Sequence, residues 1–197
     1  MYKKVFKSIL DVFFCIIVFP FFLVTLIIVS MLILFDDHGP IFYIDNRIGK
    51  SGKIFKMLKF RTMKVNSPDI RLEDGSTYNS AQDARVTRVG KFLRKTSIDE
   101  IPQILNVLLG QMSIVGFRPD PVDWLDKYTE QEKVFLSVKP GITGFNQAYF
   151  RNLADSKLKI ANDINYAENI SFIFDIKILL RTFLTVLRRE KLYAERD

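Results

Sequence analysis

The sequence predicts a helix-rich α+β domain packed on an N-terminal membrane helix, and three observations carry this fold class. Val12 to Phe35 forms an uncharged run of 24 residues, long enough at about 1.5 Å per residue to cross a bilayer as a helix. Two short apolar runs around a polar turn predict one β-hairpin. Most later segments have helical patterns. We therefore expect a membrane segment with its basic flank over residues 1–36 and a cytosolic globular domain over residues 37–197.

The composition narrows the chemistry that this domain can carry. Its 29 Lys and Arg against 22 Asp and Glu give a net charge of +7, which favours anionic partners such as phosphates, nucleic acids or acidic lipids. The one cysteine, Cys15, excludes a disulfide framework or a cysteine zinc cluster within one chain, and the one histidine, His38, excludes multi-histidine metal sites. A carboxylate, lysine or tyrosine is the expected acid, base or nucleophile.

Two features of the apolar run argue against a simple membrane span. Pro20 lies inside it and should kink a helix, because proline lacks a backbone donor and clashes with the preceding turn. Both flanks are basic, although the positive-inside bias predicts cations mainly on one side; the flanking residues are Lys3, Lys4, Lys7, Arg47, Lys50 and Lys53. A kinked helix that dips into the membrane and returns to the cytosolic face explains both features. A kinked transmembrane helix is the alternative interpretation. A signal peptide is disfavoured because its apolar region has only ~7 to 15 residues.

The elements after this run follow from local patterns. Ile41 to Tyr43 and Ile54 to Phe60 are short apolar or alternating runs separated by a turn at 50–53, which predicts the hairpin. Val65 to Asp83 is polar and rich in turn residues, so we expect a loop. The predicted helices are Arg88–Lys95, Glu100–Leu109, Pro121–Tyr128, Glu130–Leu136 and Lys157–Asn169.

A further helix is predicted near the C-terminus, at 171–189. Its apolar residues recur at helical spacing, so one face is apolar; they are Ile173, Ile176, Leu180, Phe183, Leu184 and Leu187. Basic residues flank that face, which is typical of an amphipathic helix at a membrane interface. A core helix of the globular domain would show the same pattern, and both interpretations stay open.

The adjacent carboxylates Asp99 and Glu100 have a structural and a chemical interpretation. Ser97 and Glu100 have the spacing of a capping box, and Pro102 puts the acidic pair at or beside a helix start. A helix start also presents free N–H groups to an anion. Five cations precede the pair, as either a solvated basic face or a phosphate site: Arg85, Arg88, Lys91, Arg94 and Lys95. In a diphosphate site, such carboxylates can hold Mg²⁺ and one can attack phosphorus.

The run from Asp83 to Leu108 resembles the signature of the bacterial sugar transferases, also called monotopic phosphoglycosyl transferases. The likeness continues through residues 110–119 and 139–144, and upstream through 46–47 and 55–63. It covers nearly the full length, including the apolar N-terminus, so we expect the chain to hold little beyond the anchor and the catalytic unit. The resemblance implies a monotopic, re-entrant helix in the bacterial cytoplasmic membrane, with the catalytic domain facing the cytosol.

The resemblance also implies a two-step reaction. Asp99 would attack the β-phosphate of a UDP-sugar and release UMP, after which undecaprenyl phosphate, a polyprenol phosphate, would take the phosphosugar. Glu100 would help to bind Mg²⁺ together with Asp99, or would manage the acceptor proton. Arg94 would contact a phosphate, Arg118 with Pro119 would belong to the nucleotide-binding loop, and Lys59 with Arg61 would line the same polar face.

The sequence departs from the family pattern at several positions. Phe117 stands where a proline usually precedes the arginine of the loop, and Gln111 stands where an aspartate is common. Residues 145–147 and 149–151 also differ. These changes leave the proposed nucleophile untouched and bear on nucleobase and sugar recognition.

Two rival functions remain at the level of the sequence. One is direct, one-step transfer with Asp99 only as a metal ligand. The other is a basic, membrane-tethered binding module without turnover. The expected partners are a UDP-sugar, undecaprenyl phosphate and membrane lipid, without nucleic acid. The sugar, the pathway and the choice between monomer and homodimer are left open.

Overall fold

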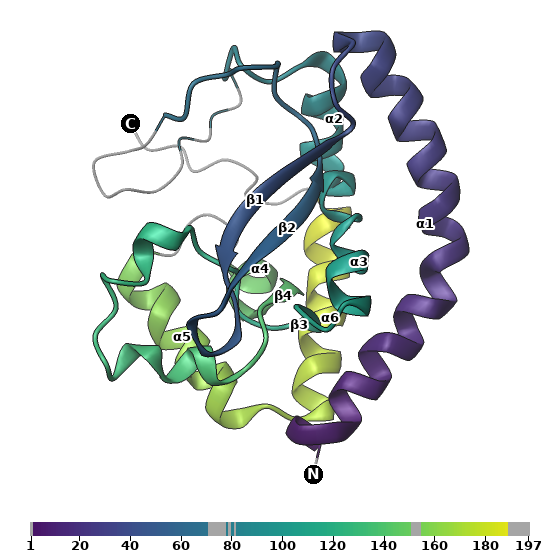
Figure 1. Ribbon diagram of the computed structural model, residues 1–197. Helices are drawn as coiled ribbons and strands as arrows, with labels where there is room; N and C mark the ends of the chain where they lie inside the picture. Colours follow the sequence, from purple (N-terminus) through teal and green to yellow (C-terminus); the bar gives the residue numbers. More distant parts are fainter. Residues whose placement is uncertain (1, 71–77, 79, 81, 151–154, 189–197) are drawn as a thin grey trace.

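The computed structural model describes residues 2–70, 78, 80, 82–150 and 155–188, and Figure 1 shows their arrangement. A long N-terminal helix lies along one side of a smaller mixed domain.

The α-helices are α1 (Lys7–Asp37), α2 (Arg88–Thr96), α3 (Gln103–Leu108), α4 (Phe145–Tyr149), α5 (Ser156–Asn169) and α6 (Phe172–Leu187). The strands are β1 (Phe42–Ile48), β2 (Ile54–Phe60), β3 (Ser113–Val115) and β4 (Gly141–Thr143). Short helical turns are η1 (Tyr2–Phe6), η2 (Lys50–Gly52), η3 (Ile98–Glu100), η4 (Val122–Trp124) and η5 (Glu132–Ser137). The helix-rich α+β class is confirmed.

Helix α1 is long and apolar enough to cross a membrane. Among the described residues, no other helix has both this length and this composition. It has 31 residues and continues through Pro20. One face packs on the domain through residues spaced by whole turns: Cys15, Phe22, Val29 and Ile33. Most other side chains of α1 are exposed apolar groups. The predicted apolar helix is therefore confirmed, and the structure extends it to residues 7–37.

Both ends of α1 are attached to the domain by polar contacts. At the N-terminal end, the Asp175 carboxylate of α6 accepts hydrogen bonds from Lys7 Nζ at 2.7 Å and Tyr2 Oη at 2.6 Å. At the C-terminal end, Asp36 Oδ2 accepts from the Val89 N–H of α2 at 2.9 Å, and Asp37 pairs with Arg61. Both ends of α1 therefore contact the same globular domain.

The hairpin and a second, smaller sheet position the rest of the domain. Strands β1 and β2 pair antiparallel, with Phe42 opposite Phe60 and Ile48 opposite Ile54, so the predicted hairpin is confirmed and β1 is longer than expected. Strands β3 and β4 pair in parallel, and the sequence did not predict them. The main core lies between this small sheet and helices α4, α5 and α6.

The predicted helices are confirmed in part. Helices α2 and α5 match the expectations within one residue at each end. The helix expected at 100–109 is divided into η3 and α3, and the helices expected at 121–128 and 130–136 are short 3₁₀ turns. Part of the predicted loop at 65–83 lies outside the described residues.

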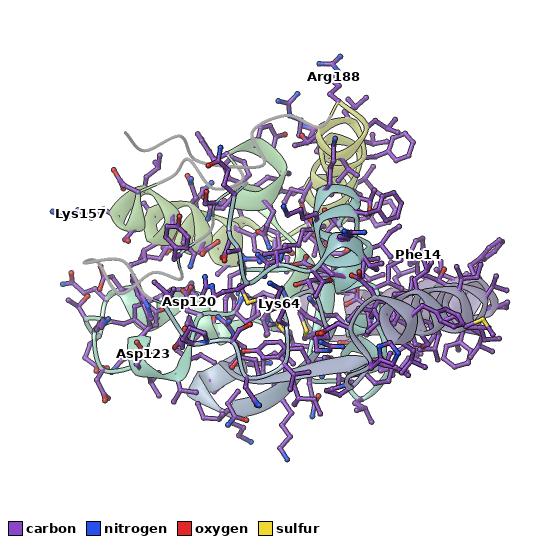
Figure 2. All side chains as sticks on the ribbon, turned by 90° about the horizontal axis from the view of Figure 1, so that it is seen from above. Phe14, Lys64, Asp120, Asp123, Lys157 and Arg188 are labelled. Carbon is purple, nitrogen blue, oxygen red and sulfur yellow. The ribbon has the colours of Figure 1, made fainter. Side chains whose placement is uncertain are left out.

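Helix α6 confirms the predicted C-terminal amphipathic helix. It buries Asp175, Ile178 and Thr185, while Phe172, Ile173, Leu180, Phe183 and Leu187 are more than half exposed. Figure 2 shows α6 and α1 along the same side of the molecule, with Phe14 projecting there, while Asp123 and Lys157 lie on the opposite side. The exposed apolar residues of the two helices thus lie on one side of the molecule, away from Asp123 and Lys157.

Candidate active site

Asp99 and Glu100 lie in η3, the single turn between α2 and α3. Ser97 ends α2 in the left-handed conformation at φ +59°, which few residues other than glycine, asparagine and aspartate adopt. Its side chain makes no capping hydrogen bond, so the predicted capping box is wrong. The Glu100 N–H donates instead to the Ser97 carbonyl oxygen at 3.3 Å. Pro102 does stand at the start of α3, as expected, and the acidic pair therefore precedes a helix start.

Glu100 is held by two cations from distant parts of the chain. Its Oε1 accepts from Lys59 Nζ of β2 at 2.8 Å and from Arg118 Nη1 at 3.1 Å. Burial alone would raise the pKa of Glu100, but the charges of Lys59 and Arg118 outweigh it and lower the pKa to about 2. Glu100 is therefore ionised and fixed in place at neutral pH.

Asp99 has the same surroundings but lacks such contacts. Its carboxylate accepts no hydrogen bond from the part of the chain that the structure describes. Burial, followed by the negative charge of Glu100, raises the pKa of Asp99 to about 6, while Lys59, Arg94 and Arg118 act in the opposite direction. A carboxylate that is poorly solvated, lacks hydrogen bonds and is close to cations is suited to attack an electrophile.

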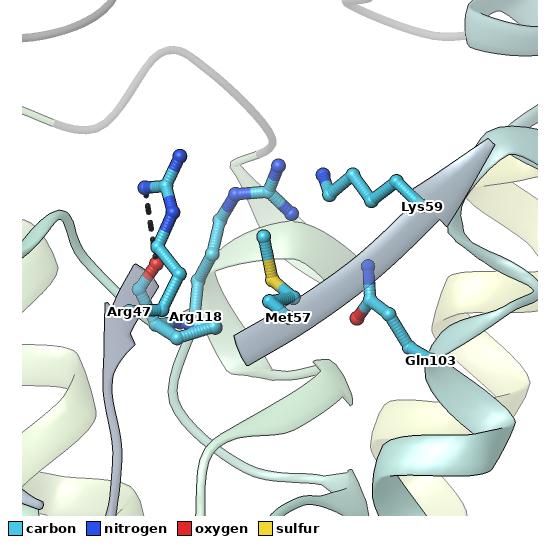
Figure 3. Close-up of a pocket in the computed structure, with 6 residues that line it drawn as sticks. Arg47, Met57, Lys59, Gln103 and Arg118 are labelled. Atoms are coloured by element: carbon cyan, nitrogen blue, oxygen red, sulfur yellow. Dashed lines mark hydrogen bonds between the residues drawn. The ribbon is translucent and has the colours of Figure 1, made fainter. Parts of the chain in front are cut away.

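A narrow cleft opens beside this pair. It is lined by Arg47, Met57, Lys59, Gln103, Arg118 and Pro119 and has a volume of about 30 Å³, room for about one water molecule. Figure 3 shows the terminal nitrogens of Arg47, Lys59 and Arg118 on the same side of the cleft. An anion such as a diphosphate would therefore bind over the cleft mouth rather than inside it.

The other predicted site residues divide into two groups. Arg94 lies near the pair: its Nε donates to Thr62 Oγ1 at 2.9 Å and its charge acts on Asp99. Pro119 lines the cleft, and its carbonyl oxygen accepts from Arg47 Nη1 at 3.5 Å (Figure 3). Arg61 lies apart, buried at the end of α1, where its Nε donates to the Pro40 carbonyl oxygen at 2.6 Å.

Sequence reasoning assigned no role to three residues of the cleft: Arg47, Met57 and Gln103. All three stand inside the motifs that carried the family resemblance, and this was the available signal. The alternation of β1 gave a second signal for Arg47, because strand residues two apart share a face; its Nε donates to Asp45 Oδ2 at 2.7 Å. That contact orients the guanidinium toward Pro119.

The loop that carries Arg118 is anchored on both sides. Phe117 is buried in the core, with its ring 4.9 Å from that of Phe135, which explains how an aromatic residue replaces the usual proline. Asp120 accepts from Tyr128 Oη at 2.6 Å and from Lys159 of α5. Arg118 is thus fixed in position by its neighbours along the chain.

The acidic pair offers few ligands to a metal ion. The described residues contain no group of three or more His, Cys, Asp or Glu side chains that would hold a metal ion. Asp99 and Glu100 together offer two carboxylates, and Glu100 Oε2 makes no hydrogen bond to a described residue. Mg²⁺ in phosphate-binding enzymes is commonly held by one or two carboxylates, water and substrate phosphates, so the donor set fits Mg²⁺.

Comparison with known proteins places the chain in a family. The family model described as bacterial sugar transferase matches residues 2–189. The galactosyl transferase CpsE of Streptococcus agalactiae is 43% identical over 77% of this chain and 35% of its own length. The undecaprenyl-phosphate galactose phosphotransferase of Salmonella typhimurium is 40% identical over 80% of this chain and 35% of its own.

A shorter relative is covered more fully. The exopolysaccharide production protein ExoY of Sinorhizobium fredii is 40% identical over 81% of this chain and 76% of its own. The chain therefore spans about a third of the length of the first two relatives and about three quarters of the third.

Proposed function

Because the chain belongs to the bacterial sugar transferase family, we propose that it transfers a phosphosugar from a UDP-sugar to undecaprenyl phosphate and releases UMP. The observation that carries this proposal is the contrast within the acidic pair. Glu100 is fixed by Lys59 and Arg118, whereas Asp99 beside it keeps both carboxylate oxygens free of hydrogen bonds from described residues. A relative named as an undecaprenyl-phosphate galactose phosphotransferase supports the acceptor and a sugar phosphate as the transferred group.

In the first step, an Asp99 oxygen attacks the β-phosphorus of the UDP-sugar. A new P–O bond forms, the bond from that phosphorus to the oxygen bridging the α-phosphate breaks, and UMP leaves with the electron pair. The product is an acyl phosphate of Asp99 that carries the sugar. Lys59, Arg94 and Arg118 stabilise the negative charge that spreads over the phosphate oxygens.

In the second step, a phosphate oxygen of undecaprenyl phosphate attacks the same phosphorus. The acyl phosphate bond breaks and Asp99 returns as a carboxylate, while the lipid keeps a diphosphate-linked sugar. Asp99 and Glu100 would hold Mg²⁺, which when bound neutralises charge on the donor diphosphate. Glu100 keeps Lys59 and Arg118 beside the reacting phosphate through its two hydrogen bonds.

We also propose that α1 is a re-entrant helix of the cytoplasmic membrane and that the catalytic domain faces the cytosol. Lys7 and Asp36, near opposite ends of α1, both contact the one globular body. A helix that crossed the bilayer would carry one of these ends away from that body. The exposed apolar residues of α6 lie on the same side of the molecule as α1 (Figure 2), which supports an interfacial position for α6.

The reaction is tested by UMP release from a panel of UDP-sugars by membrane-embedded protein with Mg²⁺ and undecaprenyl phosphate. We expect release by the wild type and by Asp126→Asn, a control at an exposed carboxylate, and release about 10⁴-fold slower by Asp99→Asn. No release by the wild type with any donor, or equal release by Asp99→Asn, would contradict the proposal. A non-catalytic binding module predicts the first of these outcomes.

The two-step order has its own test. Mass spectrometry of protein quenched with donor and without acceptor should find a phosphosugar on the peptide that contains Asp99. If turnover proceeds without this adduct and with ternary-complex kinetics, direct transfer replaces the covalent mechanism.

The topology is tested with single cysteines in a Cys15→Ser background, at Val5 and at His38, which flank most of α1. A membrane-impermeant maleimide should label both positions from the cytosolic side. Labelling of the two positions from opposite sides would establish a transmembrane helix.

A further inference from the structure

A second cavity lies at the other end of α3, away from the acidic pair. Its volume is about 420 Å³, within the roughly 300–1,000 Å³ range of small-molecule sites. It lies between the turn of the hairpin, which is at the lower end of β1 and β2 in Figure 1, and the residues that follow α3. Phe55 lines this cavity, whereas Met57, two residues further along β2, lines the catalytic cleft, and the two linings share no residue. The cavity is therefore distinct from the active site.

The cavity is lined by three cations and no anion. Lys50 and Lys53 come from the hairpin turn and Lys139 from the segment before β4. None of the three forms a salt bridge with a residue that the structure describes. The remaining polar side chains are Ser51 and Gln111, and Gln111 Oε1 accepts from Asn106 Nδ2 at 2.7 Å. Three unpaired cations around one concave surface attract a phosphate group.

The rim of the cavity is apolar and reaches the membrane helix. Ile54 is 46% exposed and Leu109 is 69% exposed. Lys139 Nζ lies 3.5 Å from Ser8 Oγ, in the first turn of α1, and Ile9 beside it is 58% exposed. The cationic surface is thus continuous with the apolar surface of α1 where that helix begins. Such a junction fits a ligand with an anionic head and an apolar tail.

We propose that this cavity binds the phosphate headgroup of an anionic glycerophospholipid, with the acyl chains along Leu109 and the start of α1. The inference rests on the membrane insertion of α1 within the proposed function. It assigns Lys50, Lys53 and Lys139 to lipid binding, separately from turnover.

Native mass spectrometry of the detergent-solubilised full chain tests this assignment with phosphatidylglycerol, phosphatidylcholine and inorganic phosphate as separate probes. We expect one tightly bound phosphatidylglycerol, with phosphatidylcholine and inorganic phosphate at least about tenfold weaker. The triple variant Lys50→Ser, Lys53→Ser, Lys139→Ser should bind phosphatidylglycerol about 100-fold more weakly, because each lysine near an anionic lipid surface contributes about fivefold. The control triple Lys127→Ser, Lys133→Ser, Lys157→Ser removes equal charge from outside the cavity and should bind like the wild type.

Three outcomes would overturn the assignment: equal affinity of the cavity variant for phosphatidylglycerol, equal affinity of the wild type for phosphatidylcholine, or inorganic phosphate bound as tightly as the lipid. Gln111→Asp provides a second variant if the triple does not fold, and its added carboxylate should weaken phosphatidylglycerol at least about fivefold; unchanged affinity would also overturn it. UMP release from the same samples tests the proposed function independently. If the wild type binds the lipid but releases no UMP, the proposed function is contradicted and the assignment of the lipid site is supported.

Discussion

Two groups of carboxylates differ in how completely their oxygens are hydrogen-bonded. At the N-terminal end of α1, Asp175 accepts at Oδ2 from Lys7 and at Oδ1 from Tyr166 at 2.7 Å. Asp11 accepts there at Oδ2 from Ser113 Oγ at 2.6 Å and at Oδ1 from the Ile114 N–H. Beside β2, by contrast, Glu100 is bound by two cations and Asp99 accepts no hydrogen bond from described residues.

The comparison teaches that burial and cations alone do not identify a reactive carboxylate. Both groups combine carboxylates with cations in low-exposure surroundings. Hydrogen bonds to both oxygens of Asp11 and of Asp175 make the first group an attachment, because protein donors already occupy each oxygen. The second group leaves Asp99 available, and this availability is what suits it to chemistry.

The largest expected effect is the loss of turnover in Asp99→Asn. The amide has nearly the same shape but is a poor nucleophile, so UMP release should fall about 10⁴-fold. The thermal midpoint in detergent should change little, since Asp99 accepts no hydrogen bond from the described residues that the substitution would break. If Asp99→Asn keeps its activity, Asp99 is not the reactive carboxylate. If Asp99→Asn unfolds, Asp99 has a structural role like that of Asp11 and Asp175.

The next effect is on stability, at the attachment of α1. Lys7→Met leaves Asp175 without its cation, and breaking a buried pair in this way costs about 3–5 kcal/mol of the free energy of unfolding. Lys133→Met is the matched control, because its pair with Glu130 is largely exposed and should contribute at most about 1 kcal/mol. Denaturant unfolding in detergent measures both. Equal losses would show that the pair at α1 is not a structural attachment.

Asp163 tests whether burial with few partners raises a pKa away from the catalytic cleft. It is 3% exposed and accepts from Asn146 Nδ2 at 2.9 Å. Burial raises its pKa to about 7, against the opposing charge of Lys159 and with the added repulsion of Asp120. Since the folded-state pKa exceeds the unfolded value of about 3.9, stability is highest below that value and falls as the pH rises toward 7.

Asp163→Asn should remove this dependence, because an amide does not ionise. Between about pH 5 and pH 8, the wild type should lose about 2–3 kcal/mol through this group and the variant none. Chemical unfolding at the two pH values measures the difference. An unchanged pH dependence in the variant would mean that Asp163 is ionised in the folded protein.

The smallest effect concerns one of the two cations on Glu100. Arg118 is 44% exposed, so Arg118→Ala should lower kcat/KM for UMP release about tenfold, and Arg118→Lys should recover part of that loss because the charge returns. If alanine and lysine are equally active, Arg118 contacts neither Glu100 nor a phosphate during turnover.

Local patterns predicted the parts of the fold that local physics determines. The uncharged run from Val12 to Phe35 was sufficient for α1, and the polar turn at 50–53 was sufficient for the hairpin. Pro102 placed the acidic pair before a helix. Strands β3 and β4 escaped prediction because each has three residues, too few for an alternating pattern, and their pairing joins distant segments.

The site was predicted as a set of residues but not as a set of contacts. The family resemblance implied that Lys59 and Arg61 line one polar face, and residues two apart in a strand would share a face. Strand β2 ends at Phe60, however, so the alternation stops before Arg61, which turns to Asp37 and Pro40 instead. The Lys59–Glu100 contact spans 41 positions, and no local pattern carries such information.

The attachment of α1 at its N-terminal end also sets an order of events during synthesis. Lys7 and its partner Asp175 are 168 positions apart, so at about 5–20 residues per second the ribosome needs roughly 8–34 s to supply the second after the first. During that interval the apolar helix has no protein surface to complete its N-terminal anchorage. The helix must therefore be in the lipid bilayer or bound by a chaperone before the globular domain has been synthesised. Its N-terminal end is attached only when α6 docks and Asp175 contacts Lys7.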